Sequence, residues 1–183
     1  PSFFEEYNYF HIEGYLVQNH ELISKAVELA KECDCKVSLD LASYNVVDEN
    51  LDFLRDLVKN YVDILFSNEE EAKSFTGKDP EKALDEIAEI TDIAVVKIGK
   101  NGSLVKQNND IRKIEIIPAR SIDTTGAGDL YAAGFIYGLT QNFTLDKCGD
   151  VGSILSGKVI EVIGAKMDES RWDMVRKMVK MIS

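Results

Sequence analysis

The sequence lacks an excess of positive charge and any long apolar run. Its 32 Asp and Glu residues outnumber 21 Lys and Arg residues, which gives a formal net charge of −11. No basic cluster offsets this balance, so nucleic acid is not expected as a partner. Anionic membrane surfaces are disfavoured for the same reason. No apolar run approaches the roughly 20 residues that a membrane-spanning helix needs, so no membrane partner is predicted.

Cysteine is also scarce, and its count is odd. Cys33, Cys35 and Cys148 are the three cysteines, an odd number that makes a poor disulfide framework. The Cys33-x-Cys35 spacing has no nearby Cys or His partner and is therefore a weak metal signal. The opening residues lack the basic and apolar layout of a signal peptide. Reduced thiols in a cytoplasmic protein are the expected state.

The chain does contain enough apolar residues for a sizeable core, and 183 residues fit one domain. Apolar periodicity predicts strands that alternate with helices, which is typical of an α/β protein whose mainly parallel sheet is sandwiched by helices. Ligands on such sheets bind beyond the carboxyl ends of the strands. The predicted strands are 9–17, 36–41, 61–66, 93–98, 103–106 and 111–117, with a hairpin turn at 108–110. The predicted helices are 20–33, 51–59, 68–75, 80–90, 127–139, 145–162 and 168–181.

The most informative stretch is Asp-Thr-Thr-Gly-Ala-Gly-Asp at residues 123–129, where a loop leads into a helix. Gly126, Ala127 and Gly128 are small, so their backbone N–H groups can approach a ligand closely. The first N–H groups of a helix lack intrahelical partners and, with the helix dipole, favour phosphate. Asp129 in the first turn could accept a proton from an attacking hydroxyl. The ordinary alternative is a tight turn with an acidic residue at a helix start.

This stretch resembles the C-terminal signature of the ribokinase-like sugar and nucleoside kinases, also called the phosphofructokinase B family. The resemblance implies a ribokinase-like fold. It also implies that Asp129 is the catalytic base and that Gly126, Ala127 and Gly128 form the anion hole. The segments 38–43 and 61–68 look closer to the adenosine-kinase branch, since no Arg stands between Asp40 and Asn45, where many sugar kinases carry one.

Asn68 and Glu71 are three residues apart at a predicted helix start, so they share a face. An amide and a carboxylate so placed can order water around Mg²⁺, which usually keeps several waters. The alternative is an N-capped helix with acidic residues in its first turn, and Glu69 and Glu70 are expected to be solvated. The pair matches the family's Asn-x-x-Glu motif, which implies that it organises Mg²⁺ and phosphate and that Asn68 contacts ATP.

Further ATP contacts are implied by the same resemblance. Gly99 and Gly102 could simply make a turn between two strands, but they also match the family's nucleotide loop, beside which Lys97 is a candidate phosphate contact. Ser153 falls at an adenine-contacting position, although small residues in that helix would also suit close helix packing.

A monovalent cation site, K⁺ in some family members, is implied as well. Its ligands would be the side chains of Asp123 and Asp168 and the carbonyls of Thr125, Val159, Val162 and Gly164.

His11, His20 and Trp172 show no partner pattern; we expect His20 to start a helix and Trp172 to serve packing.

The chain resembles the C-terminal portion of such a kinase. Residues 1–183 would form the ATP-binding part of the catalytic domain, without the N-terminal substrate and lid part. These residues alone are expected to lack kinase activity and to self-associate, with a homo-oligomer as one outcome.

The predicted activity is ATP-dependent transfer of the γ-phosphate to a primary hydroxyl of a sugar or nucleoside, with Mg²⁺ and in some members K⁺ as cofactors. The alternative is a nucleotide-binding module without kinase activity of its own.

Overall fold

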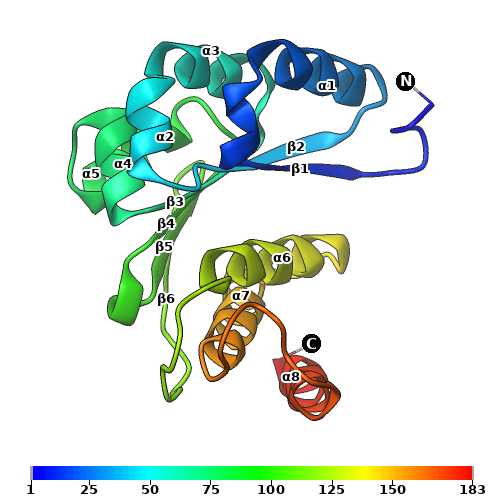
Figure 1. Cartoon of the computed structure of the whole chain (residues 1–183), viewed down its shortest axis with the longest axis vertical. Helices are drawn as coiled ribbons and strands as arrows, with labels where there is room; N and C mark the ends of the chain where they lie inside the picture. The colour runs from blue at the N-terminus through cyan, green and yellow to red at the C-terminus, as the bar shows by residue number, and fades with distance from the viewer. Residues whose placement is uncertain (1, 183) are drawn as a thin grey trace. The chain divides into compact units, whose positions relative to one another are not determined.

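The computed structural model describes residues 2–182 and shows strands alternating with helices along most of the chain (Figure 1). In chain order the elements are β1 (Tyr9–Glu13), η1 (Gly14–Gln18), α1 (His20–Glu32), β2 (Lys36–Asp40), α2 (Tyr44–Glu49), α3 (Leu51–Tyr61), β3 (Ile64–Asn68), α4 (Glu69–Thr76), α5 (Pro80–Ala88), β4 (Ile93–Lys97), η2 (Gly99–Asn101), β5 (Ser103–Gln107), β6 (Asp110–Ile114), α6 (Ala127–Thr140), α7 (Leu145–Val159) and α8 (Glu169–Ile182).

The described strands form one sheet in the order β1-β2-β3-β4-β5-β6. The pairs β1–β2, β2–β3 and β3–β4 are parallel, and the register places Glu13 opposite Asp40 and Asn68 opposite Lys97. In parallel strands the carboxyl ends meet at one edge, so these four polar residues end neighbouring strands at that edge. The predicted mainly parallel α/β sheet is confirmed.

The chain divides into two compact units. Unit 1 comprises the residues up to Ile98 together with Lys106–Ile111, and unit 2 comprises Gly99–Val105 together with the residues from Arg112 onward. Within unit 1, α1 contacts β2 and α3, and α5 contacts β4 (Figure 1). Strands β2, β3 and β4 are largely buried, as parallel strands covered by helices require, whereas β1 at the edge of the sheet is mostly half-buried.

Local sequence accounts for several helix boundaries. The side chain of Asn19 accepts a hydrogen bond from the N–H of Leu22 at 3.1 Å, which caps the first turn of α1. His20 is the first residue of α1, as predicted. Gly77 ends α4 in the left-handed conformation with φ 75°, which a glycine adopts without steric penalty.

The last strand was predicted to end at 117, but β6 ends at Ile114. Besides this, three predicted boundaries were wrong and one helix was missed. The strand predicted at 9–17 stops at Glu13, because Gly14 begins a 3₁₀ turn that lies against the carbonyl of Asp40; a Cβ on Gly14 would lie 2.5 Å from that oxygen. Helix α7 ends at Val159 rather than at 162. Helix α2 was not predicted, although Ser43 caps it by accepting from the N–H of Val46 at 3.3 Å.

The third boundary is the start of β3, predicted at 61 and found at Ile64. Helix α3 continues through Tyr61, which delays the start of the strand. The backbone of Asp63 already bonds both neighbouring strands, because its N–H donates to the carbonyl of Val37 at 2.8 Å and its carbonyl accepts from the N–H of Ile93 at 2.9 Å. The Asp63 carboxylate accepts from the N–H of Val37 at 2.7 Å and pairs with the ammonium groups of Lys31 and Lys36. These partners are distant in sequence, so the apolar pattern gave no sign of them.

In unit 2, α6 and α7 approach so closely that backbone meets backbone. A Cβ on Gly134 of α6 would lie 2.8 Å from the carbonyl oxygen of Val151, and one on Gly138 would lie 2.9 Å from Cys148. Trp172 packs against the buried cluster beneath these helices, as predicted. The buried members of that cluster are Val151, Ile154, Leu155, Val159, Met167 and Val175.

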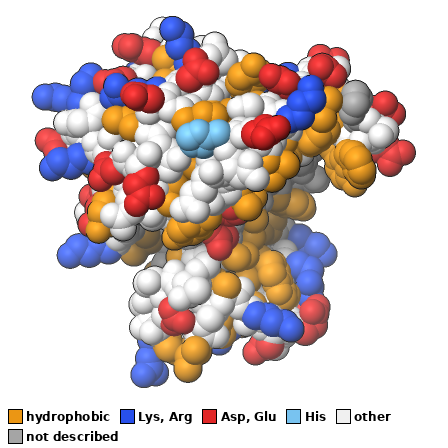
Figure 2. Space-filling view, turned by 45° about the horizontal axis from the view of Figure 1, so that its top comes forward, with side chains coloured by type: hydrophobic (Ala, Val, Ile, Leu, Met, Phe, Trp, Pro, Cys, Tyr) orange, Lys and Arg blue, Asp and Glu red, His pale blue; other side chains and the backbone are white. Residues whose placement is uncertain are grey.

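Charged side chains of both signs are interspersed over the face drawn in Figure 2. Among residues 2–182, no helix is long and apolar enough to cross a membrane. Within residues 2–182, Cys33, Cys35 and Cys148 form no disulfide bond.

The contact of α6 with α7 leads to a first prediction. Gly134→Ala should lower the free energy of unfolding by about 1–3 kcal/mol, because the new methyl group overlaps the backbone of Val151 and Gly152. In an open helix position the same change would instead stabilise by about 0.5–1 kcal/mol. Urea denaturation measures the difference. The control is Ala133→Ser on the exposed side of α6, expected within about 0.5 kcal/mol of the parent. A Gly134→Ala protein that is more stable than the parent would contradict the packing.

Candidate active site

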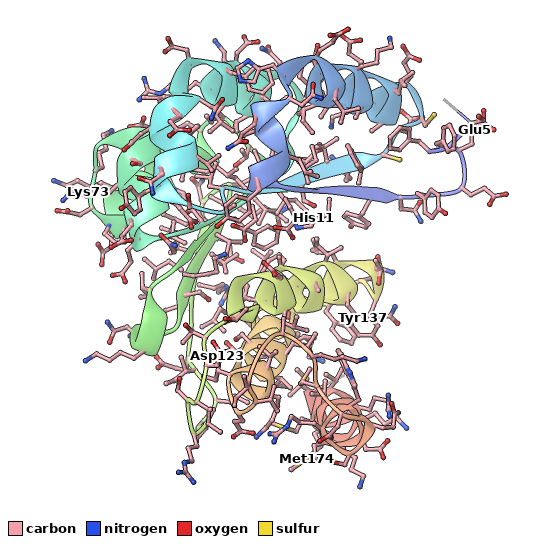
Figure 3. All side chains as sticks on the ribbon, in the orientation of Figure 1. Glu5, His11, Lys73, Asp123, Tyr137 and Met174 are labelled. Atoms are coloured by element: carbon pink, nitrogen blue, oxygen red, sulfur yellow. The ribbon has the colours of Figure 1, made fainter. Side chains whose placement is uncertain are left out.

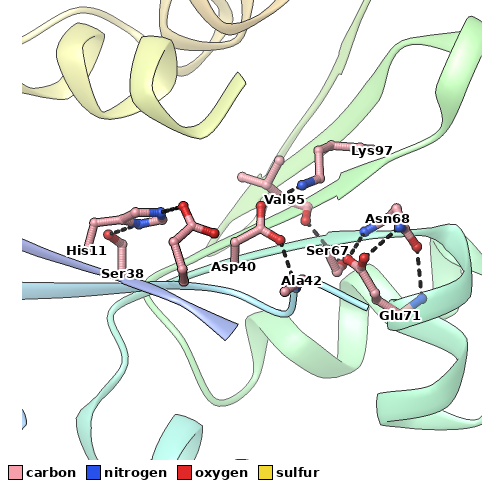
Figure 4. A network of polar contacts seen from close by, with 10 residues as sticks. His11, Ser38, Asp40, Ala42, Ser67, Asn68, Glu71, Val95 and Lys97 are labelled. Carbon is pink, nitrogen blue, oxygen red and sulfur yellow. Dashed lines mark hydrogen bonds and ion pairs between the residues drawn. The ribbon is translucent and has the colours of Figure 1, made fainter. Parts of the chain in front are cut away.

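In unit 1, polar side chains gather where the parallel strands end (Figure 4). Asp40 ends β2, Asn68 ends β3 and Lys97 ends β4, and each is followed by a turn or a helix. Asp40 is 4% exposed and Glu71, in the first turn of α4, is 2% exposed. Buried charges in one place need mutual compensation, because burial penalises each of them.

Asn68 and Glu71 form a reciprocal capping box at the start of α4. The amide oxygen of Asn68 accepts from the N–H of Glu71 at 2.9 Å, and one Glu71 carboxylate oxygen accepts from the N–H of Asn68 at 2.7 Å. The other Glu71 oxygen accepts from Nδ2 of Asn68 at 2.6 Å. The two predicted Mg²⁺-organising residues are thus in direct contact, and Glu69 and Glu70 are exposed as predicted.

The Glu71 carboxyl is held in a partly protonated state near neutral pH. Burial raises the pKa of Glu71 to about 7; the negative charge of Asp40 adds to this rise, and the positive charge of Lys97 opposes it. The group therefore changes charge within the physiological range.

Lys97 donates to the carboxylate of Asp40 at 2.6 Å, and both side chains are largely buried. Sequence reasoning singled out Lys97 but missed Asp40 as its partner. The other Asp40 oxygen accepts from the N–H of Ala42 at 3.2 Å. Ala42 has φ 63°, a left-handed conformation that disfavours any residue with a Cβ, so Asp40 helps to hold a strained turn at the strand end.

His11 extends this polar group along β1 and was also missed by sequence reasoning. Its Nδ1 lies 2.9 Å from the hydroxyl of Ser38, and its Nε2 lies 3.3 Å from Glu13. Ser38 is fully buried opposite His11 in the strand register. The other histidine, His20, bonds Asn50 at 2.8 Å and stacks on Phe53. The sequence shows no partner pattern for either histidine, because Ser38 and Asn50 lie 27 and 30 residues away from them along the chain.

In unit 2, the turn at Gly126 starts α6 and presents free backbone donors. Gly126 has φ 78° and ψ 2°, and the N–H of Leu130 donates to its carbonyl at 2.9 Å as the first helical bond. The N–H of Ala127 donates to the carbonyl of Thr124 at 3.1 Å, so this predicted donor is engaged by the turn itself. Within the described chain, no group accepts from the N–H of Gly126, Gly128 or Asp129.

The Asp129 side chain is exposed in the first turn of α6, directly beside these donors. A carboxylate and free N–H groups in one turn can receive a proton and hold an anion at the same time. Sequence reasoning named Gly126 and Gly128 but not the N–H of Asp129 itself, which the rule of unpaired donors at helix starts could have supplied.

Asp123 anchors the loop that leads to this turn (Figure 3). One carboxylate oxygen accepts from the N–H and the hydroxyl of Thr125 at 2.9 and 2.7 Å, and the other accepts from the N–H of Gly164 at 2.8 Å. The bond from Gly164 and then those from Thr125 hold the pKa of Asp123 below its usual range. The loop is further pressed against residue 165, since a Cβ on Gly126 would lie 2.6 Å from the Cβ of Ala165.

The remaining residues of the predicted cation site have partners of their own. Asp168 caps α8 by accepting from Ser170 and from the N–H of Arg171 at 2.7 and 2.9 Å, and these two bonds lower its pKa. The carbonyl of Val159 accepts from the N–H of Val162 at 3.1 Å. Among the described residues of the predicted cation site, these bonds join Asp123 with Thr125 and Gly164, and Val159 with Val162.

The predicted nucleotide contacts of unit 2 lie on two elements. The N–H of Gly102 donates to the carbonyl of Gly99 at 3.1 Å, which closes a turn before β5. Ser153 of α7 is 5% exposed and donates to the carbonyl of Glu115 at 3.0 Å. Its hydroxyl therefore already serves the packing of α7 on the segment after β6.

The donor chemistry fits the implied cations. In the described residues, no group of three or more His, Cys, Asp or Glu side chains could hold a metal ion. Mg²⁺ requires no such cage, because it is usually bound through one or two carboxylates with waters and substrate phosphates. Asp40, Asn68 and Glu71 supply hard oxygen atoms of that kind in unit 1. In unit 2, the side chain of Asp123 and loop carbonyls supply the oxygen atoms that K⁺ accepts.

Comparison with known protein families now identifies the chain. The model of the pfkB family carbohydrate kinases matches residues 2–171. The chain belongs to this family. The resemblance drawn from residues 123–129 is thus confirmed at the level of the family.

Solved structures support the same assignment. A probable sugar kinase from Rhizobium etli superposes with a TM-score of 0.89 at 33% identity, over 95% of this chain and 55% of that one. The adenosine kinase of Sinorhizobium meliloti superposes with a TM-score of 0.90 at 28% identity, over 97% and 56%. The ribokinase-like fold is confirmed.

Among curated relatives, the ATP-dependent 6-phosphofructokinase of Thermoanaerobacterium thermosaccharolyticum is 27% identical over 97% of this chain and 63% of its own length. The chain therefore spans less than two thirds of the length of the relatives described here.

The raised pKa of Glu71 predicts how stability depends on pH. A carboxyl whose pKa is about 7 in the folded state and about 4.5 when unfolded binds more protons in the folded state between these values. Its contribution to stability therefore falls as pH rises from about 4.5 to 7, by up to about 3 kcal/mol. Glu71→Gln should remove this fall. We expect the free energy of unfolding of the parent minus that of the variant to decrease between pH 5 and pH 8 in urea titrations.

The matched control is Glu69→Gln, an exposed residue in the same helical turn whose charge is not among the causes of the raised pKa of Glu71. Its difference from the parent should stay constant over the same pH range. A flat profile for Glu71→Gln would show that Glu71 ionises normally.

Proposed function

We propose that this chain is the ATP-binding part of a kinase that transfers the γ-phosphate of ATP to a primary hydroxyl of a sugar or nucleoside. The observation that carries this proposal is the first turn of α6, where the N–H groups of Gly126, Gly128 and Asp129 are free beside an exposed carboxylate. The chain belongs to a family of carbohydrate kinases, and the reaction of a kinase is phosphoryl transfer. The geometry of this turn suits that reaction.

Phosphoryl transfer needs alignment and charge stabilisation more than covalent help from the protein. The free N–H groups at the start of α6 stabilise negative charge on the transferring group, aided by the positive end of the helix dipole. Asp129 accepts the proton of the attacking hydroxyl as that oxygen bonds to phosphorus. Asp123 keeps the loop in place through its bonds to Thr125 and Gly164.

Unit 1 contributes the groups that suit nucleotide phosphates and their cation. Asn68 and Glu71 would hold Mg²⁺ through water at the start of α4. A bound Mg²⁺ supplies charge neutralisation for the phosphates. Lys97 offers an ammonium group whose position Asp40 fixes at 2.6 Å. In unit 2, Gly99 and Gly102 shape a turn that phosphates could pass closely, and Ser153 is the proposed adenine neighbour. K⁺ near Asp123 and Gly164 belongs to the same proposal.

The acceptor is proposed as a small hydroxyl compound, with the adenosine-kinase-like branch as the first to test. The adenosine kinase of Sinorhizobium meliloti and the phosphofructokinase of Thermoanaerobacterium thermosaccharolyticum match this chain at similar identity, 28% and 27%. A screen with ATP against adenosine, ribose and fructose 6-phosphate therefore covers both classes. A cytoplasmic location is part of the proposal.

The test of the catalytic base is Asp129→Asn in the full-length protein. Turnover should fall by about 10²–10⁴-fold, because the amide cannot take up the hydroxyl proton, while the affinity for ATP should change little. Steady-state kinetics and calorimetric titration of ATP measure the two effects. The control is Asp52→Asn, an exposed residue in the first turn of α3 in unit 1, which should leave turnover unchanged.

Turnover of Asp129→Asn within a few-fold of the parent would remove Asp129 from this role. Binding of ATP without phosphorylation of any acceptor would instead favour a nucleotide-binding module without kinase activity of its own.

A further inference from the structure

Tyr131 joins three elements of unit 2, and sequence reasoning gave it no role. It lies in α6 two residues after Asp129 and is 5% exposed. Its hydroxyl is hydrogen-bonded to the hydroxyl of Ser103, with an O–O distance of 2.6 Å. Ser103 is 1% exposed, so the bond is shielded from water. Phe at position 131 would fill the same space, so the hydroxyl is not required for apolar packing.

Ser103 stands at the end of the turn that carries the proposed nucleotide glycines. It directly follows Gly102, whose φ is 92° and whose Cβ, if present, would lie 1.9 Å from the carbonyl oxygen of Ile114. The backbone at Gly102 therefore packs directly against the last residue of β6. A turn held this tightly has little freedom, so a bond to Ser103 constrains the whole segment 99–103.

Tyr131 also touches α7. A Cβ on Gly152 would lie 2.9 Å from the Tyr131 carbonyl oxygen and 3.1 Å from its ring. Gly152 precedes Ser153, which is bonded to Glu115 at 3.0 Å. Tyr131 thus contacts the nucleotide turn through its hydroxyl and the proposed adenine helix through its ring, from the same helix as Asp129.

We propose that the Tyr131–Ser103 hydrogen bond is a positioning contact that sets Asp129 and the free N–H groups of α6 relative to the turn at residues 99–102. This inference rests on the proposed kinase function. Neither residue is assigned contact with ATP or the acceptor, so both act through other residues. Loss of the bond would let α6 and the turn shift against each other while each keeps its own fold.

The test is a double-mutant cycle with Tyr131→Phe, Ser103→Ala and both together in the full-length protein. Each single change leaves one buried hydroxyl unpaired, whereas the double change leaves none. We expect each single variant to lower kcat about 5- to 20-fold with the KM of the acceptor unchanged, and the double variant to lose no more than either single. Tyr137→Phe removes an exposed hydroxyl from the same helix and should leave kcat unchanged.

Urea denaturation of the same four proteins separates positioning from stability. If the bond serves folding alone, the variants lose stability but keep the parent kcat when assayed well below their melting temperatures, and the inference is overturned. Additive losses of kcat in the double variant would also overturn it, since the two hydroxyls would then act separately. A parent that binds ATP but phosphorylates no acceptor would refute the kinase proposal rather than the positioning contact. In that case, the double-mutant cycle would be measured as the dissociation constant with which each protein binds the Mg²⁺ complex of a non-hydrolysable ATP analogue. An unchanged dissociation constant in both single variants would refute the positioning contact.

Discussion

The close approach of α6 to α7 is the constraint on which unit 2 depends. Glycines at 134, 138 and 152 let the two helices meet backbone to backbone, and larger residues there would collide with main-chain atoms or with Tyr131. Packing of this kind cannot be adjusted by rotating side chains, because the atoms in contact belong to the backbone. The first turn of α6 carries the free N–H groups and Asp129, and its position in unit 2 depends on this contact between the helices.

A different kind of constraint operates in unit 1, where charges are buried at the ends of parallel strands. Asp40 and Lys97 compensate each other at 2.6 Å, and Asn68 donates two hydrogen bonds to Glu71. Removing one member of such a group leaves the other buried without compensation, which is far more destabilising than the pair itself is stabilising. These bonds therefore fix the positions of the polar side chains at this edge of the sheet.

Several residues serve the fold and the proposed reaction together. Asn68 and Glu71 cap α4 with the same oxygen atoms that would order the waters of Mg²⁺. Asp123 holds its loop through three hydrogen bonds and is also the proposed cation ligand. Helix capping and loop anchoring therefore account for these residues in the fold, and these roles are compatible with the proposed binding of cations. Substitution at these positions will disturb stability and activity at once, so Asp129, which makes no such bond within the described chain, gives the cleaner test.

Local sequence determined the alternation of strands and helices, the turn into α6 and the shared face of Asn68 and Glu71. Each of these follows from periodicity or from spacings of three or four residues, which act within one element. Tertiary structure alone decided that Lys97 pairs with Asp40, 57 residues away, and that Tyr131 bonds Ser103. It also decided that the Asp63 carboxylate binds Lys31, Lys36 and the N–H of Val37. Sheet register and helix packing determine which of these side chains meet. The local sequence carries no pattern for such pairs, because the side chains come together only after the helices and strands have assembled.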